Sequence, residues 1–144
     1  MRLMGLDVGD KTVGVAVSDE LGLTAQGVTT VERRSWAHDL AELKAIAEEY
    51  EVQKLVVGLP LNMDGSEGPR AQTSRAFAER ASAALGIPFD LWDERLSTAE
   101  VQRLLISADV SRKKRKQVVD KLAAQVILQG YLDSRPAREK DAPS

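Results

Sequence analysis

Residues 2–19 read RLMGLDVGDKTVGVAVSD, two short apolar stretches on either side of a glycine-containing turn. Side chains alternate between the two faces of a strand, so Leu3, Gly5 and Asp7 are expected on one face of a first strand. Gly9 and the polar residues after it favour a turn into a second, antiparallel strand. A carboxylate within an apolar strand is costly unless it has a partner or a cation. Asp7 is therefore a candidate metal or phosphate site, and the alternative is that it caps the turn backbone.

The composition describes one globular domain. The chain has 144 residues, 43% of them apolar, and no run approaches the roughly 20 apolar residues of a membrane span. It has no cysteine and no basic-then-apolar leader, so we expect a cytoplasmic protein without disulfides or thiolate metal sites. Because His38 is the only histidine, any metal would be held by oxygen ligands, which favours Mg²⁺ or Mn²⁺ over zinc.

Hydrophobic periodicity and turn signals predict the element order βββαβαβαα. Strands are expected at residues 2–7, 13–18, 24–31, 54–59 and 88–92, and helices at 35–50, 69–85, from a capping box at 97–100, and from after 109–111 to 133. Three antiparallel strands followed by parallel βα units are typical of the ribonuclease H-like fold, a mixed five-stranded α/β sheet flanked by helices. Residues 1–134 would form this domain, and the polar residues 135–144 a disordered tail.

Acidic side chains from three segments are expected at the carboxyl edge of the parallel strands, where ligands bind in open α/β sheets. Asp7 ends the first strand, Asp93 and Glu94 follow the fifth, and Asp120 borders the apolar stripe of the last helix. Such carboxylates can hold two cations about 3.5–4 Å apart that activate water for phosphodiester cleavage. The alternatives are a turn salt bridge of Asp93 and Glu94 with Arg95, and an Asp120 that pairs with a neighbouring lysine.

A basic run near the start of the last helix indicates a polyanionic partner. The net charge is −2, yet five consecutive residues are cations: Arg112, Lys113, Lys114, Arg115 and Lys116. Cations in the first turn oppose the helix dipole and repel one another, so phosphates would stabilise the segment. A solubilising surface is the alternative. The loop at residues 60–68, which contains Asn62, is a second candidate contact to phosphate or sugar, or else a plain turn.

Four blocks, in this order and spacing, resemble the YqgF/RuvX family: GLDVGDKTVGVAVSD, VVGLPLNMDGSEG, DERLST and KKRKQVVDKLAAQVILQGYL. The resemblance covers residues 2–133. It implies a ribonuclease H-like domain related to the RuvC Holliday-junction resolvases. It also implies a bacterial cytoplasmic nuclease that matures the 5′ end of precursor 16S ribosomal RNA.

Carried across by motif, the catalytic acids of the family fall on Asp7, on Glu94 with Asp93 as the alternative, and on Asp120. RuvC-type enzymes place an acid at the end of the strand beside the first strand, where this chain has Gly58-Leu59-Pro60. The second carboxylate would therefore come from after the fifth strand, or from the loop acid Asp64.

Together these features predict a metal-dependent nuclease with two Mg²⁺ or Mn²⁺ ions. Asp7 would bridge the ions, Glu94 and Asp120 would complete the ligand set, and water would be the nucleophile. Lys11, Arg95 and the basic run would bind phosphates of structured nucleic acid. By resemblance the substrate is precursor ribosomal RNA, alone or in ribosomal particles, and branched DNA is the alternative. A two-fold symmetric junction would favour a homodimer, whereas RNA trimming needs only a monomer.

Two rival functions belong to other classes. The pattern D-x-G-x-x-x-x-G from Asp7 also resembles a phosphate loop of actin-like and sugar-kinase-like ATPases, but those proteins bind nucleotide between two such domains and this chain has one. A non-catalytic RNA-binding ribosome-assembly factor is the other rival. It predicts that Asp7→Asn leaves function intact.

Overall fold

The computed structural model describes residues 1–94 and 112–135, with the backbone alone for residues 112–120. The described elements are β1 (Arg2–Val8), β2 (Thr12–Ser18), β3 (Ala25–Glu32), α1 (Trp36–Glu49), β4 (Val52–Leu59), α2 (Pro69–Leu85), β5 (Phe89–Asp93) and α4 (Arg112–Ser134). The strands form one sheet in the order β3-β2-β1-β4-β5. β2 is antiparallel to β1 and β3, whereas β4 is parallel to β1 and β5. The predicted mixed five-stranded sheet, with the parallel strands beside β1, is confirmed.

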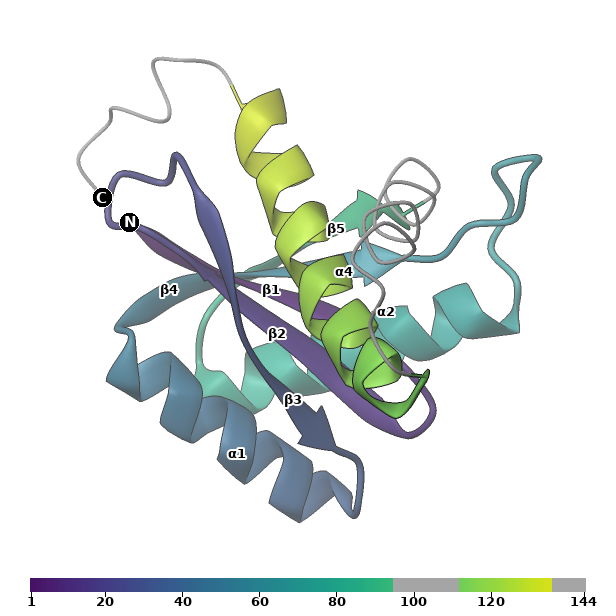
Figure 1. The fold of residues 1–144 in the computed structure, drawn as a ribbon, viewed down its shortest axis with the longest axis horizontal. Helices are drawn as coiled ribbons and strands as arrows, with labels where there is room; N and C mark the ends of the chain where they lie inside the picture. The colour runs from purple at the N-terminus through teal and green to yellow at the C-terminus, as the bar shows by residue number, and fades with distance from the viewer. Residues whose placement is uncertain (95–111, 136–144) are drawn as a thin grey trace.

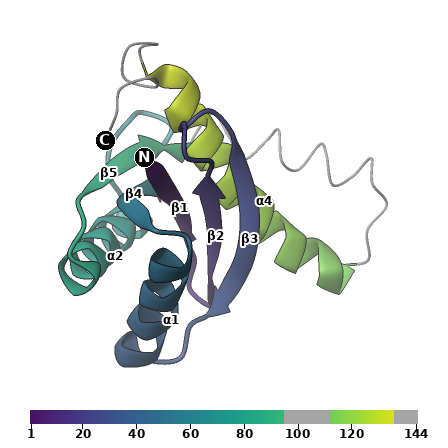
Figure 2. The same cartoon turned by 90° about the vertical axis from the view of Figure 1, so that its left-hand side faces the viewer.

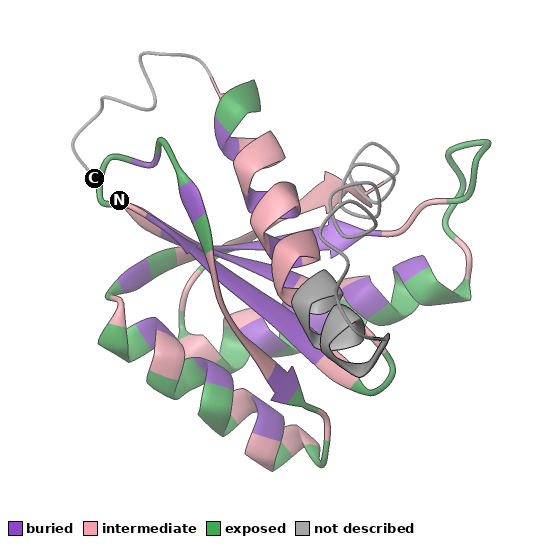
Figure 3. Ribbon diagram, viewed as in Figure 1, coloured by how far each residue is buried: buried purple, intermediate pink, exposed green. Residues whose placement is uncertain are grey.

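Helices cover both faces of the sheet. α4 crosses one face, while α1 and α2 pack on the other (Figures 1 and 2). Alternation along β1 serves both layers, because Met4 joins the core beneath α1 and α2 and Leu3 joins the core beneath α4. Gly5 lies directly under α4, where an added Cβ would come within 2.7 Å of the Leu128 Cβ. The predicted shared face of Leu3, Gly5 and Asp7 is thus the α4 face, and Figure 3 shows the central strands as the most buried part of the molecule.

The helix boundaries follow their capping signals. The Ser35 side chain accepts a hydrogen bond from the His38 amide at 3.1 Å and so caps α1. Pro69 begins α2, and Gly86 ends it with a φ of 71°, in the left-handed region that favours glycine. Both helices therefore begin and end where the sequence predicts.

Most strand boundaries differ from the prediction by one or two residues, and two of these differences concern acidic residues. β1 extends to Val8, so Asp7 lies inside the ladder opposite Gly14 and does not end the strand. β5 includes Asp93, so of the two neighbouring acids only Glu94 follows the strand. The backbone hydrogen bonds of the ladder decide these ends, and they leave no trace in the side-chain pattern.

The last helix is confirmed as α4, which ends one residue beyond the prediction. The helix predicted from residue 97, and the tail from residue 136 onward, lie outside the described residues. Gln125 and Gln129 of α4 accept hydrogen bonds from the Gly27 and Ala25 amides of β3, at 3.0 and 2.9 Å, and so cover part of that edge strand. In the described part of the chain, no helix has both the length and the apolar character to span a membrane.

Candidate active site

Asp7 lies near the end of the central strand, one residue beyond the last pair of β1 with β4 and still paired with β2. It follows Leu3 and Gly5 on the α4 face, and its side chain is half-buried. The residue opposite on β2 is Gly14, which leaves the neighbouring position without a side chain. The sequence thus places a carboxylate on a strand whose backbone is fixed by pairing.

A second carboxyl group reaches Asp7 from β5. The Glu94 side chain hydrogen-bonds the Asp7 carboxyl, although the two residues are two strands apart in the sheet. The intervening strand permits this contact only because it has glycine at position 58. A Cβ added there would lie 2.6 Å from the Glu94 Oε1 and 2.6 Å from the Ile127 Cδ1. Gly58 therefore makes the room through which Glu94 reaches Asp7.

The alternation along β5 explains why Glu94, and not Asp93, meets Asp7. Leu91 packs with the core under α1 and α2, while Trp92 lies against Gly130 of α4. Because successive side chains alternate between the two faces, Asp93 points to the same face as Leu91. Glu94 points to the same face as Trp92, which is the face covered by α4. The loop acid Asp64 accepts hydrogen bonds from the amide and hydroxyl of Ser66, at 2.9 and 2.6 Å, within its own loop.

The Asp7 carboxyl affects the ionisation of Glu94. Burial raises the pKa of Glu94 to about 9, assisted by the hydrogen bond to Asp7 and by the negative charge of Asp7. The charge of Asp93 acts in the same direction, and the positive charge of Arg70 opposes it. Near neutral pH, without a cation, Glu94 therefore keeps its proton.

The direction of α4 places Asp120 toward the Asp7 end of β1. Leu132, late in α4, lies at the β2–β3 turn near the start of β1, whereas the Leu128 Cβ and the Ala124 carbonyl lie 2.7 and 3.0 Å from a Cβ placed at Gly5. Asp120 is one turn before Ala124, so its backbone lies farther along the same direction, beyond Gly5. Its side chain is outside the described residues.

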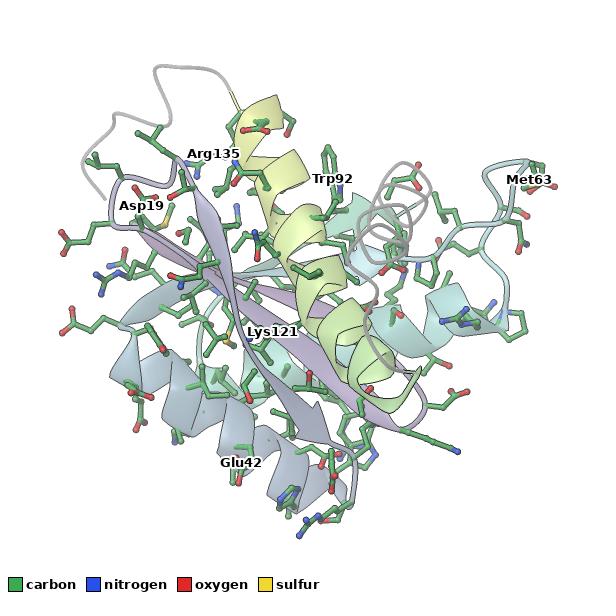
Figure 4. The ribbon with its side chains drawn as sticks, viewed as in Figure 1. Asp19, Glu42, Met63, Trp92, Lys121 and Arg135 are labelled. Atoms are coloured by element: carbon green, nitrogen blue, oxygen red, sulfur yellow. The ribbon has the colours of Figure 1, made fainter. Side chains whose placement is uncertain are left out.

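The predicted phosphate contacts are distributed around this edge. Lys11 is exposed in the β1–β2 turn, and the basic residues 112–116 form the first turns of α4. Arg95 lies outside the described residues. Asn62 donates to the Ser66 hydroxyl at 3.0 Å, so its amide helps to shape the loop between β4 and α2. Figure 4 shows Met63 at the far tip of that loop.

Arg70 is a site residue that the sequence analysis missed. It is exposed in the first turn of α2, and its positive charge acts on Glu94. Nothing in the pattern of side chains marks it. The available signal was topological, because a helix that follows a parallel strand begins at the carboxyl edge of the sheet.

The chemistry of this edge fits a hard divalent cation. Carboxylate oxygens are the preferred ligands of Mg²⁺ and Mn²⁺, and a carboxyl group that keeps its proton beside another carboxyl group can exchange it for a cation. Among the side chains that the structure describes, no group of three His, Cys, Asp or Glu residues gathers around one point. The structure thus brings two carboxyl groups into contact. The negative charge of Asp93 acts on Glu94, and the backbone of Asp120 lies toward the Asp7 end of β1.

Solved structures show that the fold is that of RuvC-like, ribonuclease H-fold proteins. Thermus thermophilus RuvC, in complex with a Holliday junction substrate, is 14% identical, with a TM-score of 0.54 over 94% of this chain and 96% of that one. The fowlpox virus Holliday junction resolvase is 13% identical, with a TM-score of 0.55 over 94% of this chain and all of the viral one. At these identities the likeness concerns the fold.

Curated relatives match nearly end to end. A Myxococcus xanthus protein is 60% identical over 141 residues, which cover 98% of this chain and 93% of that one. A Symbiobacterium thermophilum protein is 57% identical over 142 residues, which cover 99% of both. Each carries the name "Putative pre-16S rRNA nuclease". The family model RuvX, described as Holliday junction resolvase, matches residues 1–134. The chain therefore belongs to the RuvX family and, with it, to the phosphodiester-hydrolysing enzymes.

Proposed function

We propose that the chain is a metal-dependent nuclease centred on Asp7 and Glu94 and that it trims the 5′ end of precursor 16S ribosomal RNA. The observation that carries the chemistry is the contact between these two carboxyl groups across Gly58. The substrate rests on the names of the relatives that match almost the whole chain.

The proposed cofactor is Mg²⁺ or Mn²⁺, bound as two ions. Ions of this kind supply an activated water and stabilise the leaving oxygen of the phosphodiester. Asp7 would hold the ions, because the ladder fixes its backbone and Glu94 contacts its carboxyl group. Glu94 and Asp120 would complete the ligand set, while Asp93 would contribute charge from the other face of β5.

The remaining residues of the edge bind and orient the nucleic acid. Lys11, Arg95 and the basic run at residues 112–116 neutralise phosphates, and Arg70 brings a further cation to the carboxylate pair. The proposal places the protein in the cytoplasm, acting on precursor RNA alone or in ribosomal particles. Trimming of an RNA end requires only a monomer.

There are two alternatives to this function. Resolution of Holliday junctions is supported by the description of the family, and the RuvC relative of known structure is solved with such a junction. Its two-fold symmetric substrate would call for a homodimer. A non-catalytic assembly factor is disfavoured by the carboxylate pair, since a protein that only binds RNA gains nothing from two half-buried carboxyl groups held in contact.

The test is cleavage of two labelled substrates side by side, a precursor 16S RNA fragment and a four-way DNA junction, with Mn²⁺ or Mg²⁺. We expect cuts in the RNA at the 5′ end, lost in EDTA and reduced at least a hundredfold in Asp7→Asn and Glu94→Gln, with binding retained. Glu48→Gln, the same change on an exposed α1 residue, is the control and should cleave normally.

The outcomes separate the alternatives. Metal-dependent cuts confined to the junction would assign the chain as a resolvase. Binding of RNA without cleavage by the wild type, and full function of Asp7→Asn in ribosome maturation, would assign it as an assembly factor and refute the nuclease proposal.

A further inference from the structure

A single residue from outside the hairpin holds the β1–β2 turn, residues 9–12. Arg33, just after β3, donates from its guanidinium to the Gly9 carbonyl at 3.2 Å and from its backbone amide to the Lys11 carbonyl at 2.8 Å. Within the turn, the Gly9 amide donates to the Thr12 carbonyl at 2.8 Å. Two of the four turn residues thus hydrogen-bond through their carbonyls to Arg33.

The Arg33 side chain is itself fixed from three sides. Its guanidinium carbon lies 5.3 Å from the centre of the Trp36 ring and 5.2 Å from that of Phe77, and the side chain is 19% exposed. Its Nε lies 3.7 Å from the Asp39 carboxylate, which is 3% exposed. The other oxygen of Asp39 accepts hydrogen bonds from the Arg34 amide, at 3.0 Å, and from His38. The guanidinium therefore has one available geometry.

This arrangement is costly for a hairpin turn at the protein surface. A largely buried guanidinium loses most of its hydration, and one carbonyl with one 3.7 Å ion pair returns only part of that free energy. Lysine could not substitute, because its point charge lacks the planar guanidinium that lies against the Trp36 and Phe77 rings, whose centres are 5.4 Å apart, while it donates to the Gly9 carbonyl. A turn that only joined two strands would not need such an anchor, since its own hydrogen bond would suffice.

Lys11 belongs to the β1–β2 turn, whereas Asp7 is held in place by the pairing of β1 with β2. Asp7 is paired with Gly14, and Val8 with Val13, so the ladder fixes the strand up to the residue before the turn. Lys11 lies beyond that pairing and is exposed. Arg33 thus determines where Lys11 is presented, but not where Asp7 stands.

We infer that Arg33 is a positioning residue for nucleic-acid binding, which holds the β1–β2 turn so that Lys11 meets a phosphate beside the carboxylate pair. The inference deepens the proposed function and rests on it. Asp39, Trp36 and Phe77 orient the guanidinium, and its hydrogen bond to the Gly9 carbonyl transmits that orientation to the turn that carries Lys11. Loss of Arg33 should weaken binding through Lys11 and leave the chemical step unchanged.

The experiment is a double-mutant cycle between Arg33→Met and Lys11→Met. Binding of a fluorescein-labelled RNA hairpin with a single-stranded 5′ extension is followed by anisotropy in EDTA, over a range of salt. We expect each single variant to bind about fivefold more weakly and to lower the salt slope by about 0.7–0.9, which is the loss of one phosphate contact. The double variant should bind no more weakly than either single variant.

Two further variants separate positioning from folding. Arg80→Met removes a cation that also lies over Trp36, at 3.9 Å. Within the described part of the chain Arg80 makes no hydrogen bond to the turn, so this variant should bind as the wild type. Arg33→Lys, which keeps the charge, should behave like Arg33→Met. In Mn²⁺, the Arg33 variants should show a raised KM and a kcat within twofold of the wild type.

Each other outcome counts against the inference. Additive losses in the double variant, an unchanged salt slope in Arg33→Met, or wild-type binding by Lys11→Met would overturn it, while normal cleavage by the wild type would leave the nuclease proposal standing. A wild type that neither binds nor cleaves RNA would overturn both. If Arg33→Met does not fold, the same cycle with Arg33→Lys decides.

Discussion

Glu94→Gln should stabilise the metal-free protein as the pH rises, although it destroys the proposed site. The pKa of Glu94 is raised from 4.5 to about 9, so the folded chain keeps this proton between those values while the unfolded chain releases it. Because the unfolded state binds fewer protons there, the free energy of unfolding falls by about 1.4 kcal/mol for each pH unit. Between pH 5.5 and 7.5 the wild type should lose about 3 kcal/mol.

Glutamine removes this dependence because it is an uncharged isostere whose amide can still donate to Asp7. At pH 7.5 in EDTA, Glu94→Gln should be more stable than the wild type by up to about 4 kcal/mol, or roughly 13 °C in Tm. The measurement is urea unfolding at pH 5.5, 6.5 and 7.5, which gives the free energy of unfolding of both proteins. Other shifted groups affect the stability outside this pH range. Asp39 and Asp90, whose pKa values are lowered, affect it at acidic pH, and Tyr131, whose pKa is raised, affects it at alkaline pH.

Glu67→Gln is the matched control. The Arg75 hydrogen bond lowers the pKa of Glu67, which is an effect of opposite sign, so this variant should gain no stability as the pH rises. Adding Mn²⁺ at pH 7.5 should stabilise the wild type, release protons and leave Glu94→Gln unchanged. Two results would refute the coupling of the two carboxyl groups. One is a wild type whose free energy of unfolding does not change between pH 5.5 and 7.5. The other is a Glu94→Gln variant that is less stable than the wild type at every pH in this range.

Three further results are expected. Gly58→Ala should abolish cleavage and cost about 1–3 kcal/mol in urea unfolding, because its Cβ would meet the carboxylate pair at 2.6 Å. Gly5→Ala should cost at least as much in the same assay but shift no pKa, since its Cβ would meet the Leu128 Cβ at 2.7 Å and not the pair. Replacing Lys113, Lys114 and Lys116 with Gln should weaken RNA binding and lower the salt slope by about 2–3, measured by anisotropy, with kcat retained at saturating RNA.

Most of the architecture could be predicted because its signals are local. The alternation around Asp7 indicated which face of β1 meets α4, and the caps at Ser35, Pro69 and Gly86 marked the ends of α1 and α2. Each of these signals involves neighbouring residues, so one sequence is enough to read it.

The choice between Asp93 and Glu94 could not be made from the sequence in the same way. β5 has only five residues, and its sequence FDLWD places apolar side chains on both faces, so its phase is not apparent. That phase appears only when Trp92 is found against α4. Arg70 could not be predicted for a related reason. Its charge acts on Glu94 because the start of α2 and the end of β5 meet in space.

Gly58 connects a single residue of the sequence to the geometry of the site. It lies on β4, between the strand that carries Asp7 and the end of β5. A Cβ at position 58 would come within 2.6 Å of the Glu94 Oε1 and 2.8 Å of its carboxyl carbon, so a larger side chain would have to displace the Glu94 carboxyl group. That carboxyl group hydrogen-bonds Asp7 from the far side of β4. The glycine and the carboxyl contact therefore depend on each other, although they belong to different segments of the chain.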